Sequence, residues 1–394
     1  MPPKRSRPAP PRSGKPPAAA RKPKKNKAPT GAGASPAAGD LSGRFAATMA
    51  TLGGTWPGAV AVSGGGDSVA LMRLLADWAK AQNNTPPVVL TVDHGLQPDS
   101  HKNAEQARKL ARGLGLSMQV LVWKGPKPSA DIEAEARTAR YRLMASWCRE
   151  HHVGALYLAH TLDDQAETFL LRLARGSGLD GLSAMKPVSA LPIPEFAEIT
   201  LVRPLLDIRR AELREFLNSR GLQWSEDPMN TDPRFARSRL RAAWPQLTAL
   251  GLLPTRIADA ARHLGRAREA LETITAEFLQ RGVRHQSGAA LLDPIRLKLL
   301  PREIGMRSLA TLLCLVSGEE YRPRFESLER LFDSIVGAEL NGGATLHGCI
   351  VAPAPVRDQV FGTATLTISR EAERRIREPE PGIKEPQTRR PRKR

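Results

Sequence analysis

Short apolar runs alternate with longer amphipathic stretches through the first half of the chain. The apolar runs, which predict buried strands, cover residues 59–62, 88–93, 118–122 and 155–159. Helical periodicity starts after the first run at Val69 and recurs over residues 103–114, 132–149 and about 162–174. Strands that alternate with helices in this way predict a parallel sheet with helices on both faces. We therefore expect an α/β, Rossmann-like domain.

From about Trp244 the apolar pattern becomes mainly helical. Helical periodicity covers residues 247–253, 257–279, 291–300, 306–316 and 324–335. Two further apolar stretches, over residues 343–351 and 359–368, predict a short pair of strands. The expected organisation is a tail over residues 1–43, the α/β domain over 44–245, a mainly helical domain with a small β element over 246–369, and a charged tail over 370–394.

The net charge of +19 is concentrated at the two ends of the chain. Residues 1–40 contain ten Lys/Arg and one acidic residue, and residues 370–394 contain ten Lys/Arg and five acidic residues. Both tails are predicted to be disordered, because their composition cannot form a core. Nonspecific attraction to RNA phosphates and a purely solubilising role are equal alternatives for the N-terminal tail.

Apolar runs and cysteines bear on the compartment. No run approaches the roughly 18 to 20 apolar residues of a membrane span, and the basic N-terminus lacks the apolar segment of a signal peptide. The cysteines, Cys148, Cys314 and Cys349, form no CxxC pair, so the sequence signals no local zinc or iron–sulfur motif. We expect a cytoplasmic protein with no membrane partner.

The junction between the first predicted strand and its helix reads Ser63-Gly64-Gly65-Gly66-Asp67-Ser68. Backbone N–H groups and the positive end of a helix dipole favour an anion at such a junction, and glycine permits close approach. The segment lacks the Gly-Lys-Ser/Thr of a Walker loop, but it matches SGGxDS, the pyrophosphate loop of N-type ATP pyrophosphatases. We interpret residues 63–68 as an ATP-binding loop in which Asp67 is a catalytic residue and a Mg²⁺ ligand. A glycine turn that only joins strand to helix is the alternative.

Asp93 and His94 end the second predicted strand. Ligands of such sheets bind beyond the carboxyl ends of the strands, so we expect both residues to contact the nucleotide or the substrate. A turn-forming Asp and a surface His are the alternative.

The fourth predicted strand is followed by His160, Asp163, Asp164 and Glu167, whose spacing places them on one helical face. Carboxylates so close together repel one another unless a cation lies between them. Mg²⁺ held with ATP phosphates, or the ammonium of an amine substrate, would supply that cation. An acidic first turn that complements the helix dipole is the alternative.

These stretches belong to an ordered set of motifs. The set is SGGGDS, VDHGLQPDS, DIEAEARTARYR, LAHTLDDQAET, RGSGLDGLSAM and VRPLLDIRRAEL, followed by the Arg-rich hinge segment WSEDPMNTDPRFARSRLR. Over residues 56–245 the chain resembles the tRNA(Ile)-lysidine synthetases of the N-type ATP pyrophosphatase, or PP-loop, superfamily. The resemblance implies an adenine nucleotide alpha hydrolase-like fold. Thr161 stands where many relatives carry a second His, and Ser238 stands where Asn is common.

The activity implied by the resemblance is a carbon–nitrogen ligation in two steps. ATP adenylates the C2 carbonyl oxygen of the wobble cytidine in the CAU anticodon of isoleucine tRNA, with release of diphosphate. The amine of free L-lysine then displaces AMP to give lysidine. The modified base pairs with adenosine, which changes the specificity of the tRNA from methionine to isoleucine.

The resemblance also assigns residues. It places ATP on residues 63–68 and the chemical centre at His160, Asp163, Asp164 and Glu167. Substrate contacts fall to charged residues of the other motifs, with surface salt bridges or a solvated helix face as the alternative: Glu133, Arg137, Arg140, Arg175, Arg203, Arg237 and Arg241. RGSGLDGLSAM is interpreted as a mobile loop over the site, or as a plain glycine C-cap.

The partners implied are tRNA(Ile) with a CAU anticodon, free L-lysine, and ATP with Mg²⁺. The helical domain is expected to grip the tRNA. The sequence does not determine the oligomeric state, for which we keep a homodimer as the working expectation. A tRNA 2-thiolase of the same superfamily and an RNA-binding relative without catalysis are the alternatives. The first normally has paired cysteines, and the second does not account for an intact loop and acidic helix.

Overall fold

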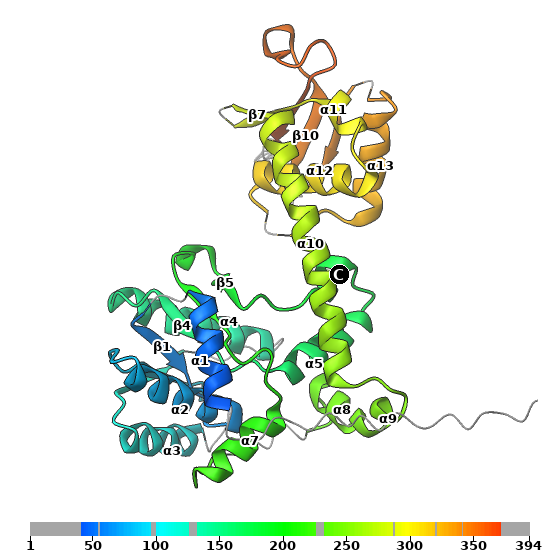
Figure 1. Ribbon diagram of the computed structural model, residues 1–394. Coiled ribbons are helices and arrows are strands. Elements are labelled where there is room, and N and C mark those ends of the chain that lie inside the picture. Colours follow the sequence, from blue (N-terminus) through cyan, green and yellow to red (C-terminus); the bar gives the residue numbers. More distant parts are fainter. Residues whose placement is uncertain are drawn as a thin grey trace, which may run out of the picture.

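The computed structural model describes residues 41–53, 56–95, 100–125, 132–225, 232–286, 288–319, 321–340 and 342–371, without the side chains of residues 100–103, 132 and 133. Residues 1–40 and 372–394 of the predicted tails, and residues 226–231 of the hinge segment, lie outside this description. The described chain forms two domains joined by one long helix (Figure 1).

The N-terminal domain is built on a six-stranded sheet in the order β3-β2-β1-β4-β6-β5. Its strands are β1 (Gly58–Ala61), β2 (Val88–Asp93), β3 (Met118–Val122), β4 (Ala155–Tyr157), β5 (Val188–Ala190) and β6 (Thr200–Val202). Neighbouring strands pair in parallel, except that β5 runs antiparallel to β6 at one edge. The four strands predicted from apolar runs are confirmed. The sequence analysis missed β5 and β6, which have three residues each.

Helices cover both faces of this sheet because successive strand side chains point to opposite sides. They are α2 (Gly66–Ala81), α3 (Ser100–Gly113) and α7 (Arg210–Ser219) on one face and α4 (Ile132–Glu150) on the other. The helices α5 (Leu162–Leu173), α6 (Leu179–Leu182) and α8 (Ala236–Ala242) lie beside the sheet. Val60 belongs to the core shared with α2, α3 and α7, whereas its neighbour Ala59 packs with Tyr141 and Met144 of α4. The expected α/β layering is confirmed.

An unpredicted helix, α1 (Leu41–Leu52), precedes the sheet. Leu41, Phe45 and Met49 recur every fourth residue and are buried in the same core as Val60. Residues 41–43, which were assigned to the tail, are thus part of a described helix.

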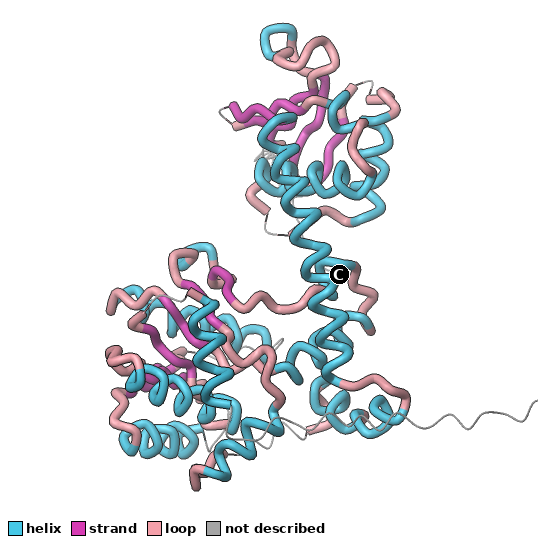
Figure 2. Tube along the Cα trace, in the orientation of Figure 1, coloured by secondary structure: helices cyan, strands magenta, loops and turns pink. Residues whose placement is uncertain are grey.

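The C-terminal domain holds a second sheet, antiparallel throughout, in the order β7-β8-β11-β10-β9. Its elements are β7 (Val283–Gln286), β8 (Ala289–Leu292), α11 (Pro294–Lys298), α12 (Arg302–Ser317), α13 (Phe325–Val336), β9 (Ala344–Leu346), β10 (Cys349–Pro353) and β11 (Leu366–Arg370). Figure 2 shows the helices packed against these strands. The expected mainly helical region with a small β element is confirmed, and its sheet is larger than the predicted strand pair.

One predicted helix of this domain is shorter than expected. Residues 291–300 were expected to be helical, but Leu291 and Leu292 lie in β8, and the helix covers Pro294–Lys298. Asp293 follows the strand, and its Oδ1 accepts the backbone N–H groups of Ile295 and Arg296, each at 3.0 Å. This N-cap, followed by Pro294, starts the short helix α11.

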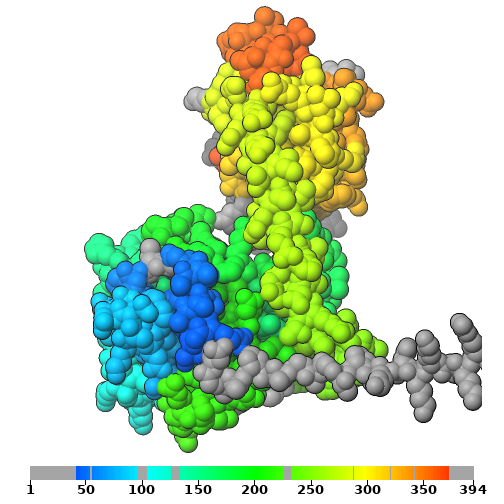
Figure 3. All heavy atoms as spheres, viewed as in Figure 1, coloured from blue at the N-terminus to red at the C-terminus, as the bar shows by residue number. Residues whose placement is uncertain are grey.

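Helix α10 (Pro254–Gly282) links the two domains, after the short helix α9 (Trp244–Ala249). Near its start, the carbonyl oxygen of Ala261 accepts the N–H of Ala184, and that of Leu264 accepts the Ser183 hydroxyl. Near its end, Phe278 is part of the C-terminal core. In Figure 3 the helix forms the visible bridge between the two domains. Within the described residues, no helix is long and apolar enough to cross a membrane.

The segment interpreted as a mobile loop, residues 175–185, contains α6 and is tied down at several points. Arg172 Nη1 donates to the carbonyl oxygen of Gly181 at 2.8 Å. Asp180 accepts from Arg307 at 2.7 Å and from Arg322 at 2.6 Å, both in the C-terminal domain. The glycine-rich segment is therefore an interdomain contact.

Candidate active site

The glycine loop leaves β1 and opens α2 as expected. Gly64 has φ +91°, which favours glycine. The Ser68 hydroxyl accepts the N–H of Ser63 at 3.2 Å and donates to the carbonyl oxygen of Gly65 at 2.8 Å. No side chain caps the N-terminus of α2, so its first N–H groups and the helix dipole are directed at the loop. This geometry suits an anion.

A second segment covers the loop. The N–H of Ser225 donates to the carbonyl oxygen of Gly64 at 2.9 Å. A Cβ placed on Gly66 would lie 3.3 Å from the ring of Trp224, so a larger residue at 66 would push the two segments apart. Residues 224–225 begin the hinge segment, and their contact with the loop was not foreseen from the sequence.

Helix α5 begins beside this loop with a capping box. Thr161 is its N-cap, and its hydroxyl accepts the N–H of Asp164. In return, Asp164 Oδ2 accepts the Thr161 N–H at 2.8 Å and the Thr161 hydroxyl at 2.8 Å. The residue that departs from the common family pattern thus has a defined structural role. Ser238, the other departure, is buried in α8.

Asp67, Asp164 and Glu167 converge on the guanidinium of Arg210, the first residue of α7. Arg210 donates to Asp67 Oδ2 at 2.9 Å, to Asp164 Oδ1 at 3.0 Å and to Glu167 Oε1 at 3.1 Å. Arg241 of α8 donates to both oxygens of Glu167, at 2.8 and 3.0 Å. The Glu167 side chain is fully buried. We name these three carboxylates, with Arg210 and Arg241, the acidic cluster.

The surroundings shift the pKa values of two carboxyl groups of the acidic cluster in opposite directions. Burial raises the pKa of Asp67, although Arg210 opposes the shift. Burial acts in the same direction on Asp164, but Arg210 and the hydrogen bonds from Thr161 outweigh it and lower the pKa of that carboxyl. Asp164 is therefore the more firmly ionised of the two.

Asp163 faces another way. Its Oδ2 accepts the backbone N–H of Arg210 at 2.8 Å, and its carboxylate pairs with the Arg209 side chain at 3.2 Å. It binds the N-terminus of α7, which favours a positioning role over the chemical role expected from its spacing.

A group of arginines lies on the other side of the α5 N-terminus, around His160. Burial lowers the pKa of His160 to about 4; Asp164 opposes this shift, while Arg203, Arg137 and Arg237 add to it. His160 is consequently neutral at pH 7, and its buried Nδ1 has no hydrogen-bond partner among the described residues. We name His160 with Arg137, Arg140, Arg203 and Arg237 the basic cluster.

Hydrogen bonds of the basic cluster go to hydroxyl groups, a carbonyl oxygen and a histidine ring. Arg137 donates to the Tyr141 hydroxyl at 3.2 Å. Arg203 donates to the carbonyl oxygen of Lys186 at 2.9 Å and to the Ser189 hydroxyl at 3.0 Å. Arg140 Nε donates to His94 Nε2 at 3.3 Å, which brings the end of β2 into the group. In the described part of the chain, none of these four arginines pairs with a carboxylate.

The remaining predicted residues are less central. Asp93 Oδ1 accepts the N–H of Gly95 at 3.0 Å, a turn at the end of β2. Arg175 is exposed in the turn after α5. Glu133 lies in α4, but its side chain is outside the described residues. Cys148 is buried in the α4 core, and Cys314 and Cys349 lie in the C-terminal domain.

Three residues at the site were not predicted from the sequence: Arg209, Arg210 and Trp224. Arg209 and Arg210 stand within the motif VRPLLDIRRAEL, but their partners are more than forty residues away in the chain, and Asp67 is 143 residues from Arg210. The signal that could have identified them in the sequence is the arginine pair at the start of α7.

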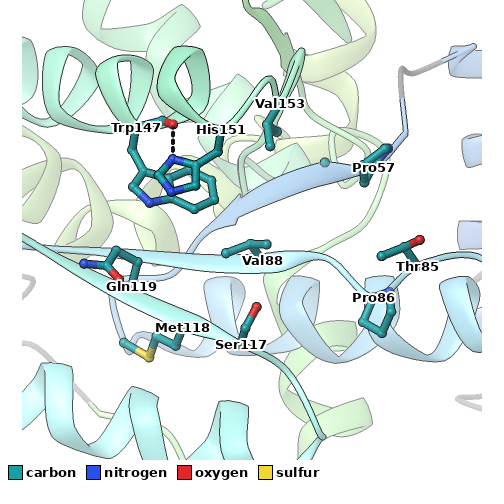
Figure 4. Close-up of a pocket in the computed structure, with 11 residues that line it drawn as sticks. Pro57, Thr85, Pro86, Val88, Ser117, Met118, Gln119, Trp147, His151 and Val153 are labelled. Atoms are coloured by element: carbon teal, nitrogen blue, oxygen red, sulfur yellow. Dashed lines mark hydrogen bonds between the residues drawn. The ribbon is translucent and has the colours of Figure 1, made fainter.

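A separate pocket of about 370 Å³ lies at the opposite end of the sheet (Figure 4). Gly58, Val88 and Met118, at the amino ends of β1, β2 and β3, line it, together with the stacked pair Trp147 and His151. Ligands of parallel α/β sheets bind beyond the carboxyl ends of strands, so this pocket is distinct from the candidate site.

The sheet, the glycine loop and the carboxylates beside it define the chain as a PP-loop protein, and the family model described as "PP-loop domain" matches residues 54–247. Relatives narrow the class. A tRNA(Ile)-lysidine synthase of Ruegeria pomeroyi is 39% identical over 292 residues, which cover 74% of this chain and 68% of the relative. One of Methylobacterium nodulans is 42% identical over 300 residues, 73% of this chain and 86% of the relative. The chain belongs to the tRNA(Ile)-lysidine synthase family.

Proposed function

We propose that this protein ligates free L-lysine to C2 of the wobble cytidine in the CAU anticodon of tRNA(Ile), at the expense of ATP. The supporting observation is that Asp67 of the glycine loop and Asp164 and Glu167 of α5 meet at one cation-binding position. This position lies at the carboxyl edge of the sheet, beside the anion-binding end of α2. ATP and an amine can therefore be held next to each other.

The first step is adenylation of the base. The loop residues 63–68 hold the ATP phosphates with backbone N–H groups. The C2 carbonyl oxygen of cytidine attacks the α-phosphorus, the bond to the β-phosphate breaks and diphosphate leaves. Mg²⁺ would neutralise the charge that develops on the phosphates when it is bound.

The residues present fit such a magnesium ion. Mg²⁺ is usually held by one or two carboxylates, substrate phosphates and water. Asp67 supplies one partly exposed carboxylate next to the loop, and no preformed group of three or more ligands exists among the described residues. Asp67 together with ATP phosphates is therefore the expected ligand set.

The second step uses the amine. The nitrogen of lysine attacks C2, AMP leaves with the C2 oxygen, and the amine loses a proton. Carboxylates of the acidic cluster are suited to bind an ammonium group of the substrate, because they are acceptors in a partly buried setting. His160 lies beside Asp164, and the burial and the arginines that lower its pKa to about 4 disfavour protonation, so we expect it to act there as a neutral hydrogen-bonding group.

RNA would bind along the basic cluster and the C-terminal domain. Arg137, Arg203 and Arg237 surround His160 without carboxylate partners in the described structure, so their charge is available to phosphates. The C-terminal domain continues from α10 and is fixed to the α6 segment through Asp180. A tRNA held by both parts would place one end of the molecule at the acidic cluster.

Radiolabelled lysine, ATP and tRNA(Ile) transcripts test the proposal. Label should enter the transcript with a CAU anticodon and should be absent from a matched transcript with GAU. The Asp67→Asn variant should release little diphosphate. Failure of the wild-type protein to label the CAU transcript would overturn the function.

A further inference from the structure

Arg210 occupies the position that an amine substrate would need. Its three guanidinium nitrogens each bind a different carboxylate, from Asp67, Asp164 and Glu167. Its backbone N–H is fixed by Asp163, and Glu212 accepts the N–H of Arg209 at 2.9 Å in the first turn of α7. These contacts in the first turn of α7 position the Arg210 side chain at the acidic cluster.

The three carboxylates depend on Arg210 to different degrees. Glu167 keeps both of its oxygens on Arg241 even without Arg210. Asp164 Oδ2 is satisfied by Thr161, while Asp164 Oδ1 faces Arg210 at 3.0 Å and Arg241 only at 4.0 Å. Asp67 Oδ2 faces Arg210 at 2.9 Å. Asp67 and Asp164 are therefore the carboxylates that can exchange one cation for another.

We propose that Arg210 is a built-in counter-cation that the ammonium of the amine substrate displaces from Asp164 and Asp67. This inference rests on the proposed function, because it takes the substrate to be an amine. Arg210 holds the carboxylates in place before the substrate arrives, and it retains Glu167 and the Asp163 contact when the other pairs exchange. Its side chain is 19% exposed, so solvent reaches the pairs that must break.

Displacement of Arg210 by the substrate ammonium predicts a change in substrate affinity that a purely structural role of Arg210 does not predict. A resident cation competes with an incoming one, so the affinity for the amine should rise when Arg210 is removed. A structural residue would lower the affinity on removal. The rate of ligation should fall in both cases, because the carboxylates lose a positioning group.

The decisive measurement is equilibrium dialysis of full-length protein with labelled lysine and ATP, at about pH 8 to keep the carboxylates ionised. Arg210→Gln should bind lysine about fivefold tighter or more, while its ligation rate falls. Arg220→Gln, an arginine at the far end of α7 that pairs with Asp77, is the matched control for the loss of one positive charge. Its lysine affinity should stay within about twofold of wild type.

Weaker or equal lysine binding by folded Arg210→Gln would overturn the exchange. If that variant does not fold, Arg210→Lys decides, because an ammonium cannot reach three carboxylates at once and should compete less well. Its lysine affinity should rise; an unchanged or reduced affinity overturns the proposal. A wild-type protein that binds no lysine would refute the proposed function itself, which is a separate outcome.

Discussion

The acidic and basic clusters adjoin at the N-terminus of α5, and they are balanced in opposite ways. Each carboxylate of the acidic cluster contacts Arg210, and Glu167 also contacts Arg241. The arginines of the basic cluster instead contact a hydroxyl, a carbonyl oxygen or a histidine ring nitrogen. Among the described residues, each carboxylate of the first cluster is therefore paired with an arginine of the protein. The second cluster carries positive charge that an external anion can neutralise.

The largest expected effect comes from breaking the acidic cluster at its buried member. Glu167→Gln removes the charge that faces both Arg210 and Arg241, and we expect a loss of about 3 kcal/mol in the free energy of unfolding. Urea denaturation measures it. The control is Glu105→Gln, whose pair with Arg108 is exposed and should contribute less than about 1 kcal/mol. Equal effects of the two changes would show that burial does not distinguish the acidic cluster.

A smaller effect is expected from the basic cluster, and on RNA binding rather than stability. Arg137→Gln should weaken tRNA binding about tenfold and reduce the slope of log affinity against log salt by about one, as for the loss of one phosphate contact. Filter binding at several salt concentrations measures both quantities. Arg73→Gln removes an arginine that already pairs with Asp77, and it should leave the slope unchanged. An equal loss in both variants would mean that only net charge matters.

The last effect concerns His160 and is absent at neutral pH. Its pKa is about 4 in the folded protein, below the usual value near 6.5, so the unfolded chain binds more protons between these values. Stability is therefore lost as pH falls from about 6.5 to 4, and His160→Gln should remove this part of the loss. The comparison is Tm against pH, with exposed His285→Gln as the control. A wild-type slope in His160→Gln would contradict the assignment.

The sequence predicted the parts of the site whose signals are local. The glycine loop and the α5 residues each follow an apolar strand, so the rule for parallel sheets was enough to group them. Helical spacing placed Asp164 and Glu167 on one face, and both carboxylates bind Arg210. Asp163 was expected on the same face, but its carboxylate binds the N-terminus of α7, an element that helical periodicity in α5 does not report.

The missed features depend on contacts between distant segments. Arg210 has no pattern of its own, and its role appears only when α2, α5 and α7 meet. From the sequence we expected an external cation among the carboxylates, whereas an arginine of the chain occupies that position. Strands β5 and β6 are too short to show a period, and they are defined by pairing with each other and, for β6, with β4.

Helix α10 sets the length of the connection between the two domains. With 29 residues it measures about 43 Å from end to end, at 1.5 Å per residue. One end is anchored beside α5 and the other in the C-terminal core, while Asp180 ties the two domains together next to it. A ligand that reaches from the acidic cluster to the far end of the C-terminal domain would have to span a comparable length. We expect a short RNA hairpin bound at the acidic cluster to leave that end uncontacted, so binding along α10 would select for molecular length as well as for base sequence.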